Sequence, residues 1–352
     1  GIGKKCKGSL ADQPPQHLGA TVLKAIVERN DVNTAEVGDV IFGTSSQRGR
    51  QSGDLARMAA LEAGFDIRSS GVTLDRFCGS GITSVNLAAM NVMSGSEDVV
   101  IAGGAEMMST FGEDGLPPNP FLDNGNEALR AVHPQPHQGV CGDAIASMEG
   151  ISREALDAHA AESQKRAANA IEKGYFDKSL IPVLGTDGSL ALDSEEFPRP
   201  GTTAEGLGEL KASFEAIADY PLDEQGTTYR KMINQKYPDL EVKHFHHAGN
   251  SSGVVDGAAA LLLASPEYAE KQGWKPRARI VAMANMGDCP TLMLNAPVPA
   301  AQRVLEKAGL SKDDIDLWEI NEAFAVVSEK FQRDLNLDRE KVNVNGGAMA
   351  LG

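Results

Sequence analysis

Features that would place a chain in a membrane or outside the cell are missing from this sequence. Its longest apolar stretches, such as Ala258–Ala264, suit buried strands and are far shorter than the ~20 residues of a membrane-spanning helix, and no signal-peptide pattern opens the chain. The four cysteines are far apart and form no CxxC pair, which argues against a disulfide framework and a zinc site; they are Cys6, Cys78, Cys141 and Cys289. We therefore expect a reducing compartment and a cytoplasmic location.

Positive charge is also scarce. With 33 basic and 49 acidic residues the formal net charge is −16, which disfavours nucleic acid and anionic membranes as main partners. An anionic small molecule needs only a few local basic groups and stays open as a ligand. The length of 352 residues suffices for two or three domain-sized units, and 37 glycines favour an α/β protein with many tight strand-to-helix turns.

Two segments of the chain are similar to each other. Leu18–Gly43 and Pro299–Ala323 each have the pattern of an amphipathic helix, a short polar link and a hydrophobic strand. In both cases a second strand and a glycine-rich turn follow, within Gly71–Gly81 and Lys341–Gly352. A repeat of this size predicts two similar α/β halves.

The two halves differ at their ends. The second half has a predicted strand, Ala278–Asp288, before its helix, whereas the chain starts at Gly1 without an initiating Met and without a counterpart. After its turn the first half continues with a predicted helix buried all round, Ile82–Val92, and a buried strand, Asp98–Ala102. The second half stops at Gly352. We therefore expect a first strand, and a final helix with further strands, to lie outside these residues.

A long region, about Thr110 to Phe245, separates the halves. It contains one clear predicted helix, Ser152–Lys173, which opens with a capping-box pattern. Loops are predicted for most of the remainder, where binding residues tend to lie on an α/β scaffold. The predicted division is thus 1–109, a first half without its first strand, 110–245, an inserted loop domain with the return to that half, and 246–352, a second half.

Cys78 lies in the most informative turn. A predicted strand, Val72–Asp75, leads into Phe77–Gly81, and a helix follows. Free backbone N–H groups and the helix dipole stabilise an anion at such a helix start, so we expect a stabilised Cys78 thiolate, the nucleophilic form. Most single cysteines are small buried hydrophobic residues. A cysteine between glycines at a strand-to-helix turn nevertheless favours a nucleophile.

Five motifs in the same order give the whole chain a close resemblance to the thiolase family. They are LDRFCGSG around Cys78, VVIAGGAEMMS (Val99–Ser109), HQG (His137–Gly139), HAGNSSGVVDGAAA (His247–Ala260) and NEAFAV (Asn321–Val326), followed by VNVNGGAMALG. The resemblance implies two similar βαβαβαββ halves in a five-layer α-β-α-β-α sandwich, with a loop domain inserted in the first half.

The resemblance also implies an acyl-CoA acyltransferase of fatty-acid and lipid metabolism. Cys78 would accept an acyl group and pass it to CoA, in thiolysis of a 3-ketoacyl-CoA, or to the carbanion of a second acetyl-CoA, in a Claisen condensation. Asn321 is similar to the asparagine that positions a water in the oxyanion hole for the enolate oxygen; a strand-end asparagine in a turn is the alternative. Glu322 is expected to anchor its loop by hydrogen bonds.

Three motifs imply contacts with the pantetheine arm of CoA. Ser252, beside Gly253, matches a serine that contacts this arm. Ala323 and Phe324 are expected to line the pantetheine tunnel. His137 matches a histidine near the pantetheine and the thioester.

Some of these assignments have competing interpretations. His137 also reads as a solvated loop histidine, because His133 lies only four residues away. Lys211 stands where family members carry a basic residue near the adenine nucleotide of CoA, but an isolated surface lysine is equally well supported. Met293 is a weaker candidate for the same region.

The sequence departs from the family pattern at two catalytic positions. The family's catalytic histidine follows an Ala-hydrophobic-Gly run and precedes proline, and none of the seven histidines has this context. The second, acid/base cysteine has no counterpart among Cys6, Cys141 and Cys289. Because the histidine normally activates the nucleophile, we predict that the parent protein is active and that these 352 residues alone are inactive.

Two further stretches are unusual. Glu215–His246 is longer than in many family members and is expected to alter the CoA entrance or the oligomer contact. His244, His246 and His247 form an HxHH cluster, and strand alternation would put the first two on one face. No Asp, Glu or Cys motif stands beside them, so we predict a structural or surface role rather than a metal site.

Two other functions compete with that of a thiolase. A ketoacyl synthase shares the fold and a cysteine nucleophile but lacks NEAF, and a non-catalytic acyl-CoA-binding subunit is disfavoured by the presence of both Cys78 and Asn321. CoA and acyl-CoA are expected as substrates, without a metal or bound cofactor, nucleic acid or membrane partner. The resemblance implies a homodimer or homotetramer. Acyl chain length and physiological direction stay open.

Overall fold

A computed structural model of the chain describes residues 1–4, 7–113 and 119–352; the predictions for Cys6 and for 114–118 of the middle region lie outside the described residues. The described chain forms two compact units. The first comprises Gly1–Leu116, Lys178–Glu196 and Val254–Val281, and the second Pro117–Asp177, Phe197–Gly253 and Ala282–Gly352, each in its described part. These units follow spatial contacts rather than chain order, so the three-part division of the sequence stays a prediction.

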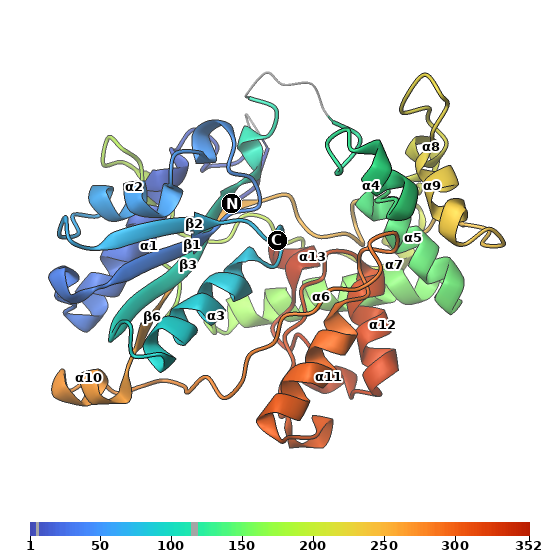
Figure 1. The fold of residues 1–352 in the computed structure, drawn as a ribbon. Coiled ribbons are helices and arrows are strands. Elements are labelled where there is room, and N and C mark those ends of the chain that lie inside the picture. The colour runs from blue at the N-terminus through green and yellow to red at the C-terminus, as the bar shows by residue number, and fades with distance from the viewer. Residues whose placement is uncertain (5–6, 114–118) are drawn as a thin grey trace. The chain divides into compact units, whose positions relative to one another are not determined.

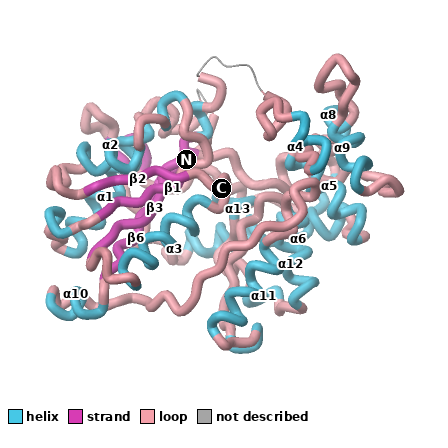
Figure 2. Tube along the Cα trace, in the orientation of Figure 1, coloured by secondary structure: helices cyan, strands magenta, loops and turns pink. Residues whose placement is uncertain are grey.

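A four-stranded sheet is the frame of the first unit (Figures 1 and 2). The strand order is β2-β1-β3-β6, with β1 parallel to β2 and β3, and β6 antiparallel to β3. These strands are β1 (Asp39–Gly43), β2 (Ser70–Leu74), β3 (Val99–Met107) and β6 (Asp256–Ala264), and a separate ribbon pairs β4 (Val183–Leu184) with β5 (Leu190–Leu192). The helices are α1 (Pro15–Asn30), α2 (Leu55–Glu62), α3 (Ser80–Met93) and α10 (Pro266–Lys271).

Strand β1 is buried on both faces because helices cover each side of the sheet. Val40 and Phe42 belong to the apolar cluster that contains Leu23 of α1, whereas Ile41 belongs to the cluster that contains Ala88 of α3. Successive side chains of a strand point to opposite faces, so a continuous apolar run suits such a central strand. The predicted helix, link and strand of Leu18–Gly43 are confirmed, as are the strands predicted near Val72 and Val99.

Two burial predictions in this unit are wrong. Helix α3 is not buried all round, because Ile82 and Met93 are 70% and 72% exposed. The stretch Ala258–Ala264 is a strand but not a buried one, since Leu261 on β6 is 56% exposed. Both elements have an apolar pattern on all sides, but β6 is an edge strand and α3 packs on the sheet with one face only.

The second unit is helical in its described part. Its helices are α4 (Glu127–Val132), α5 (Gln138–Glu149), α6 (Arg153–Glu172), α7 (Ala204–Gly208), α8 (Glu215–Ala218), α9 (Tyr229–Lys236), α11 (Pro297–Ala308), α12 (Ala325–Leu335) and α13 (Ala348–Leu351). All of them except α4 and α11 contribute to one apolar core, which includes Ile145 of α5, Leu156 of α6 and Val326 of α12. Loops were predicted for most of the rest of the middle region, and most of its described part does lie outside helices and strands, but the prediction missed helices such as α5 and α9.

The clear helix predicted at Ser152–Lys173 is confirmed as α6, but the capping box is not formed. Ser152 is the N-cap, and its Oγ accepts a hydrogen bond from the N–H of Ala155 at 3.3 Å. A capping box needs Glu or Gln at that third position to return the hydrogen bond, and alanine cannot do so.

The strands predicted in the second half are not formed. Ala278–Asp288 has no regular secondary structure, and the strand predicted to follow α11 is reduced to a single bridge between Trp318 and Val342. An extended segment becomes a strand only when a neighbour satisfies its backbone groups. In this stretch side chains do so instead, since Lys307 and Arg303 of α11 donate to the carbonyls of Met283 and Asn285. Among the described residues, no helix is long and apolar enough to cross a membrane.

Candidate active site

Cys78 lies in a tight turn between β2 and α3, as predicted. β2 ends at Leu74, and α3 begins at Ser80 after the N-cap Gly79. Phe77 has a φ of 48°, a left-handed conformation that is unfavourable for a bulky residue. The Ser80 hydroxyl stabilises the turn, because it accepts from the Arg76 N–H at 2.8 Å and donates to the Phe77 carbonyl at 2.7 Å. The turn leaves Cys78 exposed.

The predicted stabilisation of a Cys78 thiolate is not supported. Although the residue is exposed, desolvation of the sulfur raises the pKa of the Cys78 thiol above its ordinary value, and the charge of Glu106 raises it further. The amides at the helix start do not offset this effect, because the N–H groups of Gly79 and Ser80 donate to the carbonyls of Arg76 and Phe77. The thiol therefore needs a base before it can act as a nucleophile.

Glu106 belongs to the VVIAGGAEMMS motif and is the carboxylate that opposes the thiolate. It accepts hydrogen bonds from the Ser45 N–H at 2.6 Å and from Nε2 of Gln51 at 2.8 Å. Gln51 in turn accepts the N–H of Met107 at 2.6 Å through its Oε1. This network joins the end of β3 to the segment after β1, and no motif in the sequence pointed to Gln51.

An aromatic cluster of five rings lies in the second unit. The ring centroids of His137 and Phe214 are 5.4 Å apart, and those of His137 and Tyr229 are 5.7 Å apart. Phe214 and Phe324 follow at 5.8 Å, and Phe324 and His246 at 5.4 Å. The sequence predicted His137 and Phe324 as CoA-binding residues but missed Phe214 and Tyr229. Phe214 could have been found as the aromatic residue that closely follows the predicted basic position.

His137 is a helix cap rather than a solvated loop residue. It is the N-cap of α5, and its Nδ1 accepts a hydrogen bond from the Gly139 N–H at 3.1 Å. Burial lowers the pKa of His137 below its ordinary value, which favours a neutral imidazole at pH 7. His133 is exposed and belongs to no such cluster, so its nearness in sequence is no guide to the role of His137.

The HAGNSSG and NEAF motifs lie side by side. The Ser252 N–H donates to the Ala323 carbonyl at 2.9 Å, and an isolated antiparallel bridge joins Ser251 to Phe324. A Cβ on Gly253 would approach a ring carbon of Phe197 to 2.5 Å, so only glycine fits there. The structure thus brings Ser252, Gly253, Ala323 and Phe324 together at the aromatic cluster.

Glu322 anchors its loop, as predicted. Its carboxylate is fully buried and accepts from Ser163 Oγ at 2.7 Å, from Asn343 Nδ2 at 2.8 Å and from the Met349 N–H at 3.2 Å. The adjacent Asn321 is exposed. Asn321 is therefore fixed in the backbone through its neighbour while its side chain stays open to solvent.

The two weaker CoA-binding candidates differ in their surroundings. Lys211 is exposed and three residues from Phe214, outside the ring contacts of the aromatic cluster. Met293 is half-buried and packs against the apolar core that also contains Phe324 and Ala323. Its φ of 62° marks a left-handed turn.

The HxHH histidines have acidic partners that the sequence did not indicate. Nδ1 of His244 and Nδ1 of His246 each lie 2.7 Å from one oxygen of Asp143 on α5, and Nε2 of His247 lies 2.9 Å from Asp157 on α6. These carboxylates are about 100 residues away along the chain, so no local motif reveals them. A structural or surface role for these histidines stays a prediction, and the described residues contain no group of three or more His, Cys, Asp or Glu side chains that could hold a metal ion.

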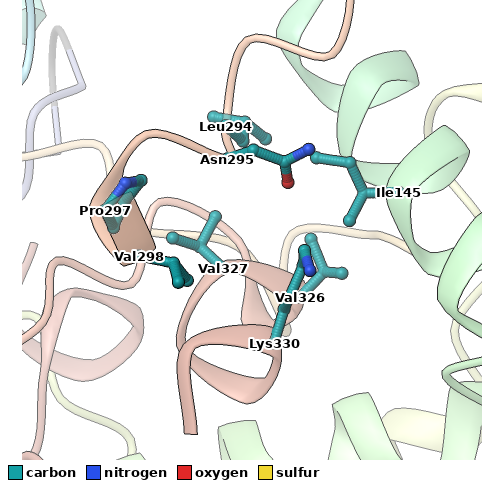
Figure 3. Close-up of a pocket in the computed structure, with 8 residues that line it drawn as sticks. All are labelled: Ile145, Leu294, Asn295, Pro297, Val298, Val326, Val327 and Lys330. Atoms are coloured by element: carbon teal, nitrogen blue, oxygen red, sulfur yellow. The ribbon is translucent and has the colours of Figure 1, made fainter. Parts of the chain in front are cut away.

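A small pocket in the second unit does not coincide with these residues. Figure 3 shows that it is lined from α5 by Ile145, from the segment around the start of α11 by four residues that include Asn295, and from α12 by Val326, Val327 and Lys330. None of the predicted site residues lines it. The Cys78 turn of the first unit and the aromatic cluster of the second are therefore two separate candidate regions, each described by itself.

A sheet that presents a cysteine at a strand-to-helix turn, together with a helical unit that carries NEAF, defines a protein of the thiolase fold. The structure matches the crystal structure of an acetyl-CoA acetyltransferase from Bacillus anthracis with a TM-score of 0.80 and 34% identity, over 99% of this chain and 84% of that one. The thiolase N-terminal domain matches residues 1–217 and the thiolase C-terminal domain residues 274–352.

Curated relatives agree with this assignment. An acetyl-CoA acetyltransferase of Escherichia coli is 38% identical over 360 residues, and a beta-ketoadipyl-CoA thiolase of Acinetobacter baylyi is 36% identical over 367 residues. Each match covers 98% of this chain and 84% of the relative. The chain belongs to the thiolase family. The predicted family and fold are confirmed, whereas the roles of single residues stay predictions.

Proposed function

We propose that this protein is a thiolase that transfers acyl groups between CoA thioesters through a thioester on Cys78. The observation that carries the proposal is the position of Cys78 in the turn before α3, in a chain that belongs to the thiolase family. The names of the relatives indicate acetyl-CoA and short 3-ketoacyl-CoA thioesters as the substrate class.

In the thiolysis direction, the Cys78 sulfur attacks the 3-keto carbon of a 3-ketoacyl-CoA. The bond between C2 and C3 breaks, the electron pair stays on C2 of the departing acetyl-CoA, and a proton completes that product. The sulfur of free CoA then attacks the acyl-cysteine and releases the shortened acyl-CoA. Condensation follows the same steps in reverse.

A base is required for the first step. Because desolvation and Glu106 raise the pKa of the Cys78 thiol, little thiolate is present at pH 7 without one. His17, the histidine of the first unit, already lies within hydrogen-bond distance of Glu62 and the Leu184 carbonyl. His17 is thus engaged in other hydrogen bonds and is a poor candidate for this base.

The aromatic cluster is the proposed binding site for the pantetheine arm of CoA. Aromatic and aliphatic walls with few polar groups are typical of such ligand sites. Phe214 joins the predicted residues His137 and Phe324, because it contacts both. Asn321 would hold the water that stabilises the enolate oxygen of acetyl-CoA.

The test is acetoacetyl-CoA thiolysis, followed as the loss of enolate absorbance after CoA is added. The protein should be active, and its Cys78→Ser variant should lose about a thousandfold or more in kcat. Cys289→Ser is the matched control and should keep its activity. A folded gene product that binds CoA but cleaves neither acetoacetyl-CoA nor longer 3-ketoacyl-CoAs would instead be a binding subunit.

A further inference from the structure

Residues 218–273 lie between the two family matches, and they contain an arginine with an unusual set of partners. Arg230 is the second residue of α9. Its guanidinium donates to both oxygens of Asp219, at 2.7 and 3.0 Å, and to the Val242 carbonyl at 2.9 Å. Its Nη2 also lies 2.8 Å from Nε2 of His244.

The contact with His244 defines the tautomer of that histidine. A guanidinium can only donate, so Nε2 of His244 accepts and its Nδ1 carries the hydrogen. Nδ1 then donates to Oδ2 of Asp143 at 2.7 Å. Arg230 is thus connected through one neutral imidazole to a fully buried carboxylate on α5.

The same carboxylate orients His246. Oδ1 of Asp143 accepts from Nδ1 of His246 at 2.7 Å, and from the backbone N–H of Phe245 and of His246 at 3.0 Å each. The His246 side chain is fully buried, and its Nε2 has no hydrogen-bond partner. Asp143 therefore makes the one hydrogen bond that orients this ring, and the ring also packs edge to face against Phe324.

The residue before Arg230 contacts the opposite end of the aromatic cluster. Tyr229 is buried, packs against His137, and donates its hydroxyl to the Pro120 carbonyl at 3.0 Å. Two consecutive residues of α9 are thus connected to the two ends of the cluster. Tyr229 contacts His137 directly, whereas Arg230 is connected to His246 through the relay Arg230–His244–Asp143–His246. Figure 1 shows α9 beside α5, the helix that carries Asp143 and is capped by His137.

We propose that Arg230 is a positioning residue for CoA binding: through His244 and Asp143 it holds the His246 ring against Phe324 and so keeps the aromatic cluster in shape for the pantetheine arm. The proposal rests on the proposed function, since it takes the cluster to be the CoA site. Arg230 contacts no substrate itself. Its loss should weaken CoA binding and leave the chemical step at Cys78 unchanged.

The sharpest test changes the middle of the relay rather than its end. His244→Leu removes both hydrogen bonds, whereas His244→Gln keeps an acceptor for Arg230 and a donor for Asp143. Arg230→Met and Asp219→Asn complete the set, and Arg68→Met is the matched control, because Arg68 makes an exposed two-bond pair with Asp66 at 2.8 and 2.9 Å in the first unit. The dissociation constant for CoA is measured by calorimetry, and KM and kcat by thiolysis.

The relay predicts a specific pattern. Arg230→Met and His244→Leu should each raise the CoA dissociation constant and KM about tenfold, the equivalent of one hydrogen bond to a charged group, with kcat within about twofold. The double variant should be no worse than either single one, as expected for one coupled network. His244→Gln should bind CoA like the wild type, as should Arg68→Met.

Other results would overturn the proposal. If His244→Leu binds CoA normally while Arg230→Met and Asp219→Asn do not, Arg230 only anchors its own segment through Asp219. If Arg230→Met does not fold, the comparison of His244→Leu with His244→Gln decides the matter, and equal affinities refute the relay. A wild-type protein that binds no CoA refutes the proposed function instead, so the two failures are distinguishable.

Discussion

The two units of this protein are stabilised by different kinds of burial. In the first unit, successive apolar side chains of β1 and β3 point to opposite faces of the sheet and pack against helices on both faces. In the second, fully buried carboxylates at Asp143 and Glu322 collect hydrogen bonds from distant parts of the chain. Apolar burial tolerates many partners of similar shape, whereas a buried charge is stable only when every hydrogen bond to it is made.

The difference extends to the cysteines. Desolvation raises the pKa of the Cys78 thiol in the first unit. Burial alone would also raise the pKa of the Cys289 thiol in the second unit, but hydrogen bonds from Tyr237 and from backbone N–H groups outweigh it and lower the pKa below its ordinary value. Hydrogen bonds thus decide the direction of the pKa shift of Cys289, and desolvation decides that of Cys78.

The largest effect on stability is expected for Asp143→Ala, which leaves four hydrogen-bond donors without their acceptor. The free energy of unfolding should fall by about 3–5 kcal/mol at pH 7. Burial alone would raise the pKa of Asp143, but hydrogen bonds from His244 and His246 outweigh it and hold the pKa below its ordinary value. The carboxylate therefore stabilises the fold above about pH 4, and this contribution is lost as the pH falls through the lowered folded pKa.

Phe42→Ala is the apolar counterpart in the first unit. It should lower the free energy of unfolding by about 3–5 kcal/mol as well, but equally at every pH, because Phe42 does not titrate. Urea unfolding of both variants at pH 7 and at pH 3 separates the two cases. A loss for Asp143→Ala that does not shrink at the lower pH would contradict the role assigned to this carboxylate.

A smaller loss is expected for Gly43→Ala, at the end of β1. A Cβ there would come within 2.6 Å of the Ser80 backbone carbon, at the first residue of α3. Relief of this clash must displace the helix start, so the free energy of unfolding should fall by about 1–3 kcal/mol. Gly81→Ala is the matched control, since its Cβ would meet nothing within 4 Å. Thermal unfolding of both variants provides the comparison. Equal stability would mean that the end of β1 shifts enough to relieve the clash without cost.

Ser152→Ala should have a more modest effect on the second unit. It removes the N-cap of α6, where the Ser152 Oγ accepts from the Ala155 N–H, and the expected loss is about 1 kcal/mol. Ser152→Gly should lower the free energy of unfolding by only about a few tenths of a kcal/mol, because glycine is itself tolerated at an N-cap. A urea denaturation series on the two variants checks the order, and the reverse order would show that the hydroxyl is not the stabilising group.

The last comparison concerns the reactivity of two cysteines rather than the stability of the fold. Cys78 should react with iodoacetamide only at higher pH than Cys289, because a raised pKa delays the appearance of the thiolate and a lowered pKa advances it. Peptide mass spectrometry across pH 6 to 10 gives the midpoint for each residue. If the Cys78 midpoint is the lower one, the helix start stabilises its thiolate after all, and the nucleophile needs less help from a base.

Long-range pairs account for what the sequence did not predict. Asp143 and His246 are 103 residues apart, and Ser163 and Glu322 are 159 apart. No residue near His246 in the sequence indicates that a carboxylate will contact it. Likewise, no residue near Phe214 indicates its contact with His137. The strand predicted at Ala278–Asp288 is not formed for the same reason. The segment has the apolar pattern of a strand, but no described strand pairs with it.

The sequence by itself determined the local elements: α1 and α6 from their helical periodicity, β1 from its apolar run, and the Cys78 turn from its glycines, together with the family that these motifs identify. Those features depend on residues within one or two turns of the chain. Only the tertiary structure decided which side of α3 is exposed, which rings join His137 and Phe324, and which carboxylates hold the HxHH histidines. Burial and charge pairing depend on atoms brought together from distant positions, and no local pattern encodes them.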